Sequence, residues 1–423
     1  MSCSCFGISN WFKGNNHNDT PGKTNIQAIA TDNVNLFSYN SLRSATRNFH
    51  PSNRIGGGGF GVVYKVSLHG FRVAFVVTAA ILQWKARFDG GLVIKTFFFF
   101  SLQGVLRDGT PVAIKCLSAE SKQGTDEFVT EIRMISTIKH PNLVELIGCC
   151  VEENNRILVY EYMENNSIST ALLGSKGKHV AMDWPTRAAI CIGTASGLAF
   201  LHEEAKPHIV HRDIKASNVL LDGNLRPKIG DFGLAKLFPD NVTHLSTRVA
   251  GTMGYLAPEY ALLGKLTKKA DVYSFGVLIL EIISGRSSSK AAFGEDLLVL
   301  VEWTWKLWKE ERLLDIVDPE MTGYPENEAT RFMKVALFCT QAAANQRPDM
   351  KQVVKMLSKD VHLNEKALTE PGIYKSQTSK RFGGVSSDET SSSHKNKGKQ
   401  SLNTSLNSAI LGSADSMTQM LPR

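Results

Sequence analysis

Residues 211–218 read His211-Arg212-Asp213-Ile214-Lys215-Ala216-Ser217-Asn218, and the chain continues to Asp231-Phe232-Gly233 and then to Ala257-Pro258-Glu259. Each of these segments is short enough to occur by chance. Their meaning depends on context, because a motif is confirmed only by the motifs and elements around it. Two further segments, which lie earlier in the chain, supply part of this context.

A glycine-rich segment runs Ile55-Gly56-Gly57-Gly58-Gly59-Phe60-Gly61-Val62-Val63-Tyr64. Gly56, Gly58 and Gly61 satisfy the spacing G-x-G-x-x-G, in which the missing Cβ atoms let backbone N–H groups approach phosphate oxygens. A dinucleotide-binding loop of this spacing needs a helix directly after it. A β-branched stretch follows here instead, so the sequence favours a hairpin over a nucleotide. A glycine-rich loop without function is the alternative.

The second segment is an expected strand that ends in a lysine, Pro111-Val112-Ala113-Ile114-Lys115. A lysine beside an apolar strand usually extends its ammonium group to water. In a helix expected over about residues 125–139, however, Glu131 shares one face with Phe128 and Ile135. An unpaired buried carboxylate is costly. We therefore expect a Lys115–Glu131 ion pair that holds the ammonium group against nucleotide phosphates.

In this order the segments resemble the motifs of eukaryotic protein kinases, G-x-G-x-x-G-x-V, V-A-I-K, H-R-D-x-x-x-x-N, D-F-G and A-P-E. Four other segments narrow the resemblance to plant receptor-like cytoplasmic serine/threonine kinases of the cold-responsive protein kinase type; these are residues 37–49, 158–162, 251–260 and 271–276. The resemblance implies an α+β class with a bilobal protein kinase fold. A small antiparallel β-rich N-lobe with one main helix would precede a larger helical C-lobe.

The resemblance also implies ATP and Mg²⁺ as cofactors and Ser/Thr hydroxyls of proteins as phosphate acceptors. Asp213 would accept or orient the hydroxyl proton, and Lys215 would lie near the γ-phosphate. Lys115, held by Glu131, would bind the α- and β-phosphates. Asn218 and Asp231 would hold Mg²⁺ through hard oxygen ligands. The other nucleotide-binding residues that it implies are Ile55, Gly56, Gly58, Gly61, Val63, Ala113, Glu161 and Met163, with Tyr160 as gatekeeper.

A phosphorylation switch is a further implication of the resemblance. Arg212 would pair with a phosphorylated activation segment, here residues 231–259. Ser246 or Thr247 is the favoured acceptor, because a phosphate there adds charge that an arginine can bind. Ordinary exposed hydroxyls are the alternative at each site. Thr252 is expected to shape the substrate-binding loop, and Glu259 and Arg347 are expected to form an ion pair in the large lobe.

Residues 66–103 interrupt the resemblance, because kinases of this type run directly from Tyr64-Lys65 into Gly104. We interpret this insertion as an unspliced intron read in frame. Val66 can begin with GT, the four phenylalanines 97–100 can encode a pyrimidine tract, and Gln103 can be CAG. Sequencing the transcripts tests this interpretation, which fails if shorter messages are never found.

The insertion falls within the second strand of the hairpin. Residues 66–68 are candidates to replace residues 105–106 in strand pairing. The apolar runs 73–82 and 97–100 would need cover or would promote aggregation, so we expect weakened stability and loss of ATP binding. The alternative function is a catalytically impaired, kinase-like scaffold.

The composition limits the class of protein. Of 423 residues, 43% are hydrophobic and 21% are charged, which indicates a globular chain. No apolar run reaches the ~18–20 residues that span a bilayer. Seven scattered cysteines favour a reducing compartment over a disulfide framework. The net charge of +8 comes almost entirely from residues 66–103 and 371–423, so no nucleic-acid partner is expected.

We therefore expect a flexible segment over residues 1–36, a kinase domain over 37–357 and a disordered Ser/Lys-rich tail over 358–423. Cys3 and Cys5 are either two exposed thiols or sites of S-acylation, and two acyl chains are about what stable anchoring requires. The expected location is cytoplasmic, and acylation would place the chain peripherally on the cytosolic face of the plasma membrane. The resemblance adds an upstream receptor kinase as a partner.

Overall fold

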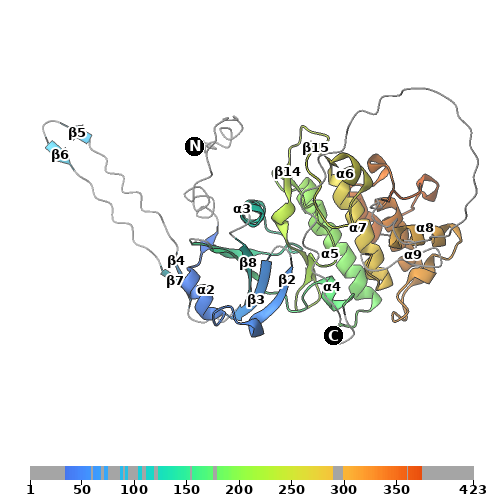
Figure 1. Cartoon of the computed structure of the whole chain (residues 1–423). Coiled ribbons are helices and arrows are strands. Elements are labelled where there is room, and N and C mark those ends of the chain that lie inside the picture. The colour runs from blue at the N-terminus through green and yellow to red at the C-terminus, as the bar shows by residue number, and fades with distance from the viewer. Residues whose placement is uncertain are drawn as a thin grey trace, which may run out of the picture. The chain divides into compact units, whose positions relative to one another are not determined.

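The chain folds into a β-rich N-lobe and a larger helical C-lobe, as Figure 1 shows for the coloured part of the chain. This confirms the α+β bilobal fold that the motifs imply. The computed structural model describes residues 34–58, 61–67, 71–74, 86–88, 91–93, 103–106, 111–118, 122–152, 155–174, 179–288, 299–359 and 361–373.

The N-lobe is built on a six-stranded sheet in the order β1-β9-β10-β8-β3-β2. Its neighbouring strands are antiparallel except β1, which runs parallel to β9. The glycine-rich segment forms the arms of a β2–β3 hairpin, with Gly58 opposite Gly61, as the sequence predicts. The strands are β1 (Asn35–Leu36), β2 (Arg54–Gly58), β3 (Gly61–Ser67), β8 (Pro111–Ser118), β9 (Leu146–Glu152) and β10 (Asn155–Glu161).

Helix α3 (Lys122–Ile135) packs on this sheet through Phe128 and Ile132, which are buried against Leu158. The helix begins and ends earlier than the expected range 125–139. Residues 136–137 form a turn instead of a further turn of helix. The short helix α2 (Tyr39–Ala45) begins after Ser38, whose hydroxyl oxygen accepts a hydrogen bond from the Ser41 amide.

The inserted residues continue strand β3. Val66 pairs with Val112 and Ser67 pairs with Pro111, so the first inserted residues take the place expected for residues 105–106. Strand β7 (Gln103–Leu106) instead pairs with β4 (Phe71–Ala74), and β5 (Ala86–Phe88) pairs with β6 (Gly91–Val93). Leu68 and residues 97–100 lie outside the described residues.

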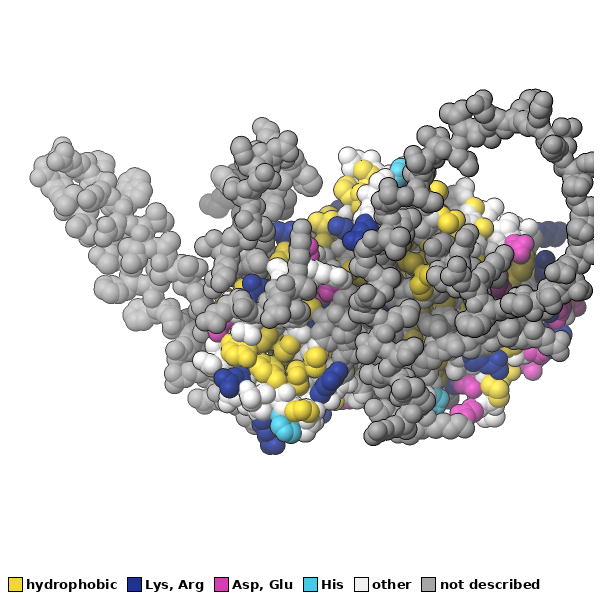
Figure 2. Space-filling view, in the orientation of Figure 1, with side chains coloured by type: hydrophobic (Ala, Val, Ile, Leu, Met, Phe, Trp, Pro, Cys, Tyr) yellow, Lys and Arg dark blue, Asp and Glu magenta, His cyan; other side chains and the backbone are white. Residues whose placement is uncertain are grey.

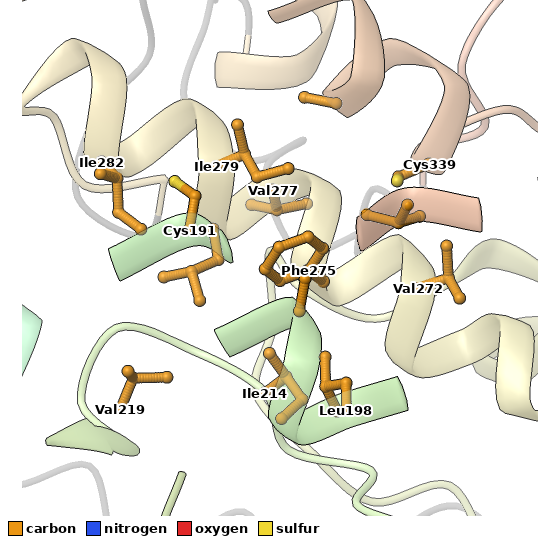
Figure 3. Packing of buried hydrophobic residues seen from close by; sticks show 14 of the residues in the cluster. Cys191, Leu198, Ile214, Val219, Val272, Phe275, Val277, Ile279, Ile282 and Cys339 are labelled. Atoms are coloured by element: carbon orange, nitrogen blue, oxygen red, sulfur yellow. The ribbon is translucent and has the colours of Figure 1, made fainter. Parts of the chain in front are cut away.

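The C-lobe is organised around helices α5 (Trp184–Glu203) and α7 (Lys268–Ser284). In the sequence, apolar residues at helical spacing over 184–202 follow Asp183, and a nearly all-apolar run over 271–284 precedes Gly285, which predicts two helices with these end residues. The Asp183 carboxylate caps α5 by accepting from the Thr186 amide at 3.0 Å, as this pattern predicts. Helix α7 is buried from Ala270 to Ser284, and Gly285 ends it with a left-handed φ of 64°, which glycine adopts without strain. Figure 3 shows Cys191 of α5 among Phe275, Val277 and Ile279 of α7.

The other C-lobe elements flank these two helices. They are α4 (Ile168–Ala171), α6 (Pro258–Leu263), α8 (Leu300–Lys309), α9 (Glu326–Cys339), α10 (Met350–Ser358), and the strand pairs β11 (His208–Val210) with β14 (Lys236–Phe238), β12 (Val219–Leu221) with β13 (Pro227–Ile229), and β15 (Leu245–Ser246) with β16 (Lys265–Leu266). None of the helices in the described part of the chain is long and apolar enough to cross a bilayer.

The described residues extend past both expected ends of the kinase domain. Asn35 and Leu36 pair with β9, although residues 1–36 were expected to be flexible. Residues 361–373 pack on the C-lobe, and Leu368 is only 9% exposed beside Trp305 and Phe338. A disordered tail starting at residue 358 is therefore wrong for this segment. Its isolated apolar residues find partners only on the assembled lobe, which composition does not reveal.

The expected Glu259–Arg347 ion pair is formed. The guanidinium Nη1 and Nη2 donate to Glu259 Oε1 and Oε2, both at 2.8 Å, and Arg347 is 1% exposed. Arg347 also donates to the backbone carbonyls of Gln341, Lys269 and Ala342. Loss of this side chain would leave a carboxylate and three carbonyls without their donor.

We expect Arg347→Leu to lower the free energy of unfolding by about 3–5 kcal/mol, the cost of leaving a buried ion-pair partner alone. Urea titration followed by circular dichroism measures this change. The matched control is Arg312→Leu, which breaks an exposed pair with Asp315 and should leave the transition nearly unchanged. If the two variants unfolded at the same urea concentration, Arg347 would not stabilise the lobe in this way.

Candidate active site

A cavity of about 510 Å³ opens between the N-lobe sheet and the C-lobe. Eleven of the residues expected in the site line it: Ile55, Val63, Ala113, Lys115, Glu131, Tyr160, Glu161, Met163, Lys215, Asn218 and Asp231. Gly56, Gly58 and Gly61 lie in the β2–β3 hairpin, which also carries Ile55 and Val63. Asp213 is not a lining residue, but its carboxylate lies 2.8 Å from Lys215 Nζ.

Lys115 joins the two lobes through two carboxylates. Its Nζ lies 2.9 Å from Glu131 Oε2, as predicted, and 2.8 Å from Asp231 Oδ1. Burial works to lower the pKa of Lys115, but Glu131 and Asp231 outweigh it and hold that pKa above its usual range. Burial likewise works to raise the pKa of Asp231, and the Lys115 ammonium outweighs it, so that pKa is lowered. Both groups are therefore charged at neutral pH.

Backbone geometry around Asp231 directs its side chain to the cavity. Asp231 has a left-handed φ of 63°, which Asp tolerates better than most residues. The next residue, Phe232, is fully buried, and its ring meets that of His211 edge-on with centroids 4.9 Å apart. Gly230 donates its amide proton to Asn218 O at 2.9 Å, which keeps Asp231 beside Asn218.

The Asp213 carboxylate receives three side-chain donors. Thr252 Oγ1 donates to Oδ1 at 2.7 Å, and Lys215 Nζ and Asn218 Nδ2 lie 2.8 and 3.0 Å from Oδ2. Lys215 Nζ also donates to Thr252 Oγ1 at 2.8 Å. These contacts fix the orientation of the carboxylate. The contact of Thr252 with Asp213 is one that the sequence analysis missed.

Asp271 of α7 anchors the backbone of this loop, and the sequence analysis missed it. Its Oδ2 accepts from the His211 amide at 2.7 Å and contacts His202 Nε2 at 2.9 Å, and its Oδ1 accepts from the Arg212 amide at 2.8 Å. Burial works to raise the pKa of Asp271, but His202 and His211 outweigh it and lower that pKa below its usual range. A carboxylate next to the apolar run of a buried helix was the available signal.

Arg212 connects the loop to the activation segment through backbone carbonyls. Its guanidinium donates to Leu234 O at 2.8 Å and to Arg248 O at 2.9 Å, and it also donates to Tyr260 Oη. Ser246 is exposed, whereas Tyr255 is buried and donates its hydroxyl to Glu281 Oε2 at 2.5 Å.

The oxygen donors of the cavity suit a cation that is shared with phosphates. Within the described residues, no group of three or more His, Cys, Asp or Glu side chains could hold a metal ion by itself. Asn218 and Asp231 supply two hard oxygen ligands, which fits Mg²⁺ because that ion is usually held by one or two protein oxygens together with substrate phosphates.

On the face shown in Figure 2, the described Lys and Arg side chains are interspersed with acidic and apolar ones.

Comparisons with known proteins agree with this geometry. The sequence profile described as "Protein tyrosine and serine/threonine kinase" matches residues 101–357, more than half of the chain. Cold-responsive protein kinase 1 of Arabidopsis thaliana is 48% identical over 350 residues, which cover 82% of this chain and 80% of that protein.

Other relatives are longer proteins. Two probable leucine-rich repeat receptor-like serine/threonine-protein kinases of Arabidopsis thaliana are 49% and 46% identical over 76% and 80% of this chain. The chain spans only 27% and 30% of their lengths. From the bilobal fold, the ordered motifs around one cavity and these matches, we conclude that the chain belongs to the protein kinase family, among relatives that are named serine/threonine kinases.

Proposed function

We propose that this protein transfers the γ-phosphoryl group of ATP, together with Mg²⁺, to Ser/Thr hydroxyls of proteins in plant signalling. One observation carries the proposal: Lys115, its partner Asp231 and Lys215 line one cavity, and Lys215 Nζ lies 2.8 Å from the Asp213 carboxylate beside that cavity. Phosphoryl transfer depends mainly on positioning and charge neutralisation. This arrangement offers a cation for phosphates next to a carboxylate for the acceptor hydroxyl.

The nucleotide would bind with its adenine between apolar side chains of the two lobes. Ile55, Val63 and Ala113 line the N-lobe side of the cavity. The Glu161 amide already donates to Glu145 O at 3.1 Å, so its carbonyl is the group we assign to the adenine amino group, with Met163 supplying a second backbone group. The buried Tyr160 limits the depth of the cavity. Lys115 and the glycine-rich hairpin would hold the phosphates.

The phosphoryl group would lie between the two lobes. Asn218 and Asp231 would hold Mg²⁺, which neutralises phosphate charge when it is bound. Asp213, oriented by Thr252 and Asn218, would orient the acceptor hydroxyl and take its proton. Lys215 donates to both Asp213 and Thr252, which places its ammonium group where it can also neutralise the transferred phosphoryl group.

Replacing the carboxylate tests this assignment. We expect Asp213→Asn to reduce autophosphorylation by about 10²–10⁴-fold, the usual contribution of a general base. The thermal shift caused by Mg²⁺-ATP should persist, because Asp213 does not line the cavity. Transfer of radiolabelled phosphate measures the first quantity, and Asp315→Asn on the exposed surface is the control. Undiminished transfer by Asp213→Asn would refute the role.

Phosphorylation of Ser246 or Thr247 is the activation step that we propose. Arg212 already donates to the carbonyl of Arg248, the next residue after Thr247, so a phosphate here would lie near an arginine. Such a phosphate can accept charge-assisted hydrogen bonds and order the segment.

We expect Ser246→Ala with Thr247→Ala to lower kcat about tenfold after preincubation with ATP, as for the loss of one hydrogen bond to a charged group. Mass spectrometry of the parent chain should find phosphate at one of these positions. Thr243→Ala is the matched control, because Thr243 is an exposed hydroxyl of the same segment. An equal loss in the control, or no loss in the double variant, counts against the switch.

The alternative function is a kinase-like scaffold that residues 66–103 make inactive. The family profile begins at residue 101, and the glycine-rich hairpin therefore lies on the other side of the insertion from the matched region. Against this, β3 keeps its register with β8 through Ser67.

Deletion of residues 66–103 distinguishes an active kinase from a scaffold that the insertion makes inactive. We expect the deletion to raise the melting temperature by about 2–4 °C for each kcal/mol recovered. ATP binding and autophosphorylation should increase with it, because a short connection would then join β3 to β8. Autophosphorylation assays and thermal scans of both chains measure the difference. No gain in activity would contradict an inhibitory role of the insertion.

We also propose an upstream receptor kinase as activator and a cytoplasmic location, with S-acylation of Cys3 and Cys5 as the route to the cytosolic face of the plasma membrane. Both cysteines lie outside the described residues, so sequence alone supports this point. Metabolic labelling with a palmitate analogue decides it, and a label that persists after Cys3→Ser and Cys5→Ser would exclude these two sites.

A further inference from the structure

Residues 361–373, here named the C-terminal strap, run along the C-lobe after α10. Leu368 is buried in the cluster formed with Trp305 and Phe338. The amide and hydroxyl of Thr369 both donate to Gln341 Oε1, at 3.2 and 3.1 Å. The strap is therefore held by apolar and polar contacts along its length.

The end of the strap meets the end of the activation segment. Tyr273 Oη donates to Gly372 O at 2.7 Å, and the Gly372 amide donates to Thr340 O at 3.3 Å. A Cβ atom on Gly372 would lie 2.6 Å from Pro258 Cγ and 2.9 Å from Ala342 Cα. Both distances are shorter than real Cβ contacts. Only a glycine fits here without a shift of Pro258, the first residue of α6.

The last described residue of the strap faces the loop that precedes α6 across a small cavity. Ile373 lines a small cavity of about 40 Å³ together with Gly254, Leu256 and Tyr273. Gly254 has a φ of 88°, so this loop has a backbone that few other residues could adopt. The start of the same loop carries Thr252, which donates to Asp213. One loop therefore shares a cavity with the strap and contacts the Asp213 carboxylate through Thr252.

We propose that the strap, through Gly372 and its partner Tyr273, is a positioning element that holds the loop 252–257 for binding of the acceptor peptide. The inference rests on the proposed function, since it assigns the loop to the protein substrate. None of the strap's described residues lines the nucleotide cavity. Loss of the strap contact therefore weakens binding of the peptide and leaves binding of ATP unchanged.

The test uses the full chain with two substitutions and two matched controls. Gly372→Ala forces the strap away from Pro258, and Tyr273→Phe removes only the hydroxyl that donates to Gly372 O. The controls are Gly223→Ala, where a Cβ atom would make an ordinary 3.5 Å contact with Glu164, and Tyr324→Phe. The probe is a synthetic peptide with a central serine. It is chosen from an arrayed peptide library as one that the unsubstituted protein phosphorylates.

We expect both strap variants to raise the KM for the peptide about threefold to tenfold, the effect of one hydrogen bond. The KM for ATP should stay within about twofold, because the nucleotide cavity is not touched. Hydrogen exchange should become faster at the amides of residues 252–257 in the strap variants and not in the controls. An unchanged peptide KM, or a change in kcat alone, overturns the proposal.

The strap proposal and the proposed kinase function can fail independently, and the experiment distinguishes the two failures. If Gly372→Ala does not fold, Tyr273→Phe decides, because it preserves the ring and its packing. If the parent chain phosphorylates none of the peptides, the proposed function fails. The hydrogen-exchange comparison then still decides whether the strap holds the loop, and equal exchange in strap and control variants overturns it.

Discussion

The buried carboxylate of Asp271 accepts hydrogen bonds from the backbone amides of His211 and Arg212. A carboxylate this deep would be costly without its donors, and two amides of an irregular loop would be equally costly without an acceptor. Each side therefore satisfies the other. Because α7 is apolar and buried around Asp271, the loop that carries Asp213 starts from a fixed point in the C-lobe.

From that anchor a series of contacts reaches the N-lobe. The ring of Phe232 lies against His211, and Asp231 turns towards Lys115. Lys115 in turn contacts Glu131 of α3. The Glu131 side chain is buried, and Lys115 and Asp231 are partly buried, with 12% and 31% of their side chains exposed, so each charge depends on the one next to it. The relative placement of α3 and the Asp213 loop therefore rests on Lys115, whose ammonium group is shared between the lobes.

The insertion is compatible with this arrangement for two physical reasons. Strand β3 keeps its pairing with β8 through Ser67, so the part of the hairpin that carries Val63 retains its partners. The entropic cost of closing a loop rises only slowly with its length, so a long connection costs little more than a moderate one. The structural consequence is a different partner for β7, which pairs with β4.

The sequence by itself determined the fold class, helices α5 and α7 with their end residues, and the Lys115–Glu131 and Glu259–Arg347 pairs. Caps, glycine ends and helical periodicity are local, and the two ion pairs follow from motifs of known order. Only the tertiary structure decided the contact of Lys115 with Asp231, the anchor at Asp271 and the course of residues 361–373. Asp231 lies 116 residues from Lys115, and Asp271 lies 60 residues from His211. Residues this far apart in the sequence come into contact only when whole helices and strands pack together, so no local sequence pattern predicts these contacts.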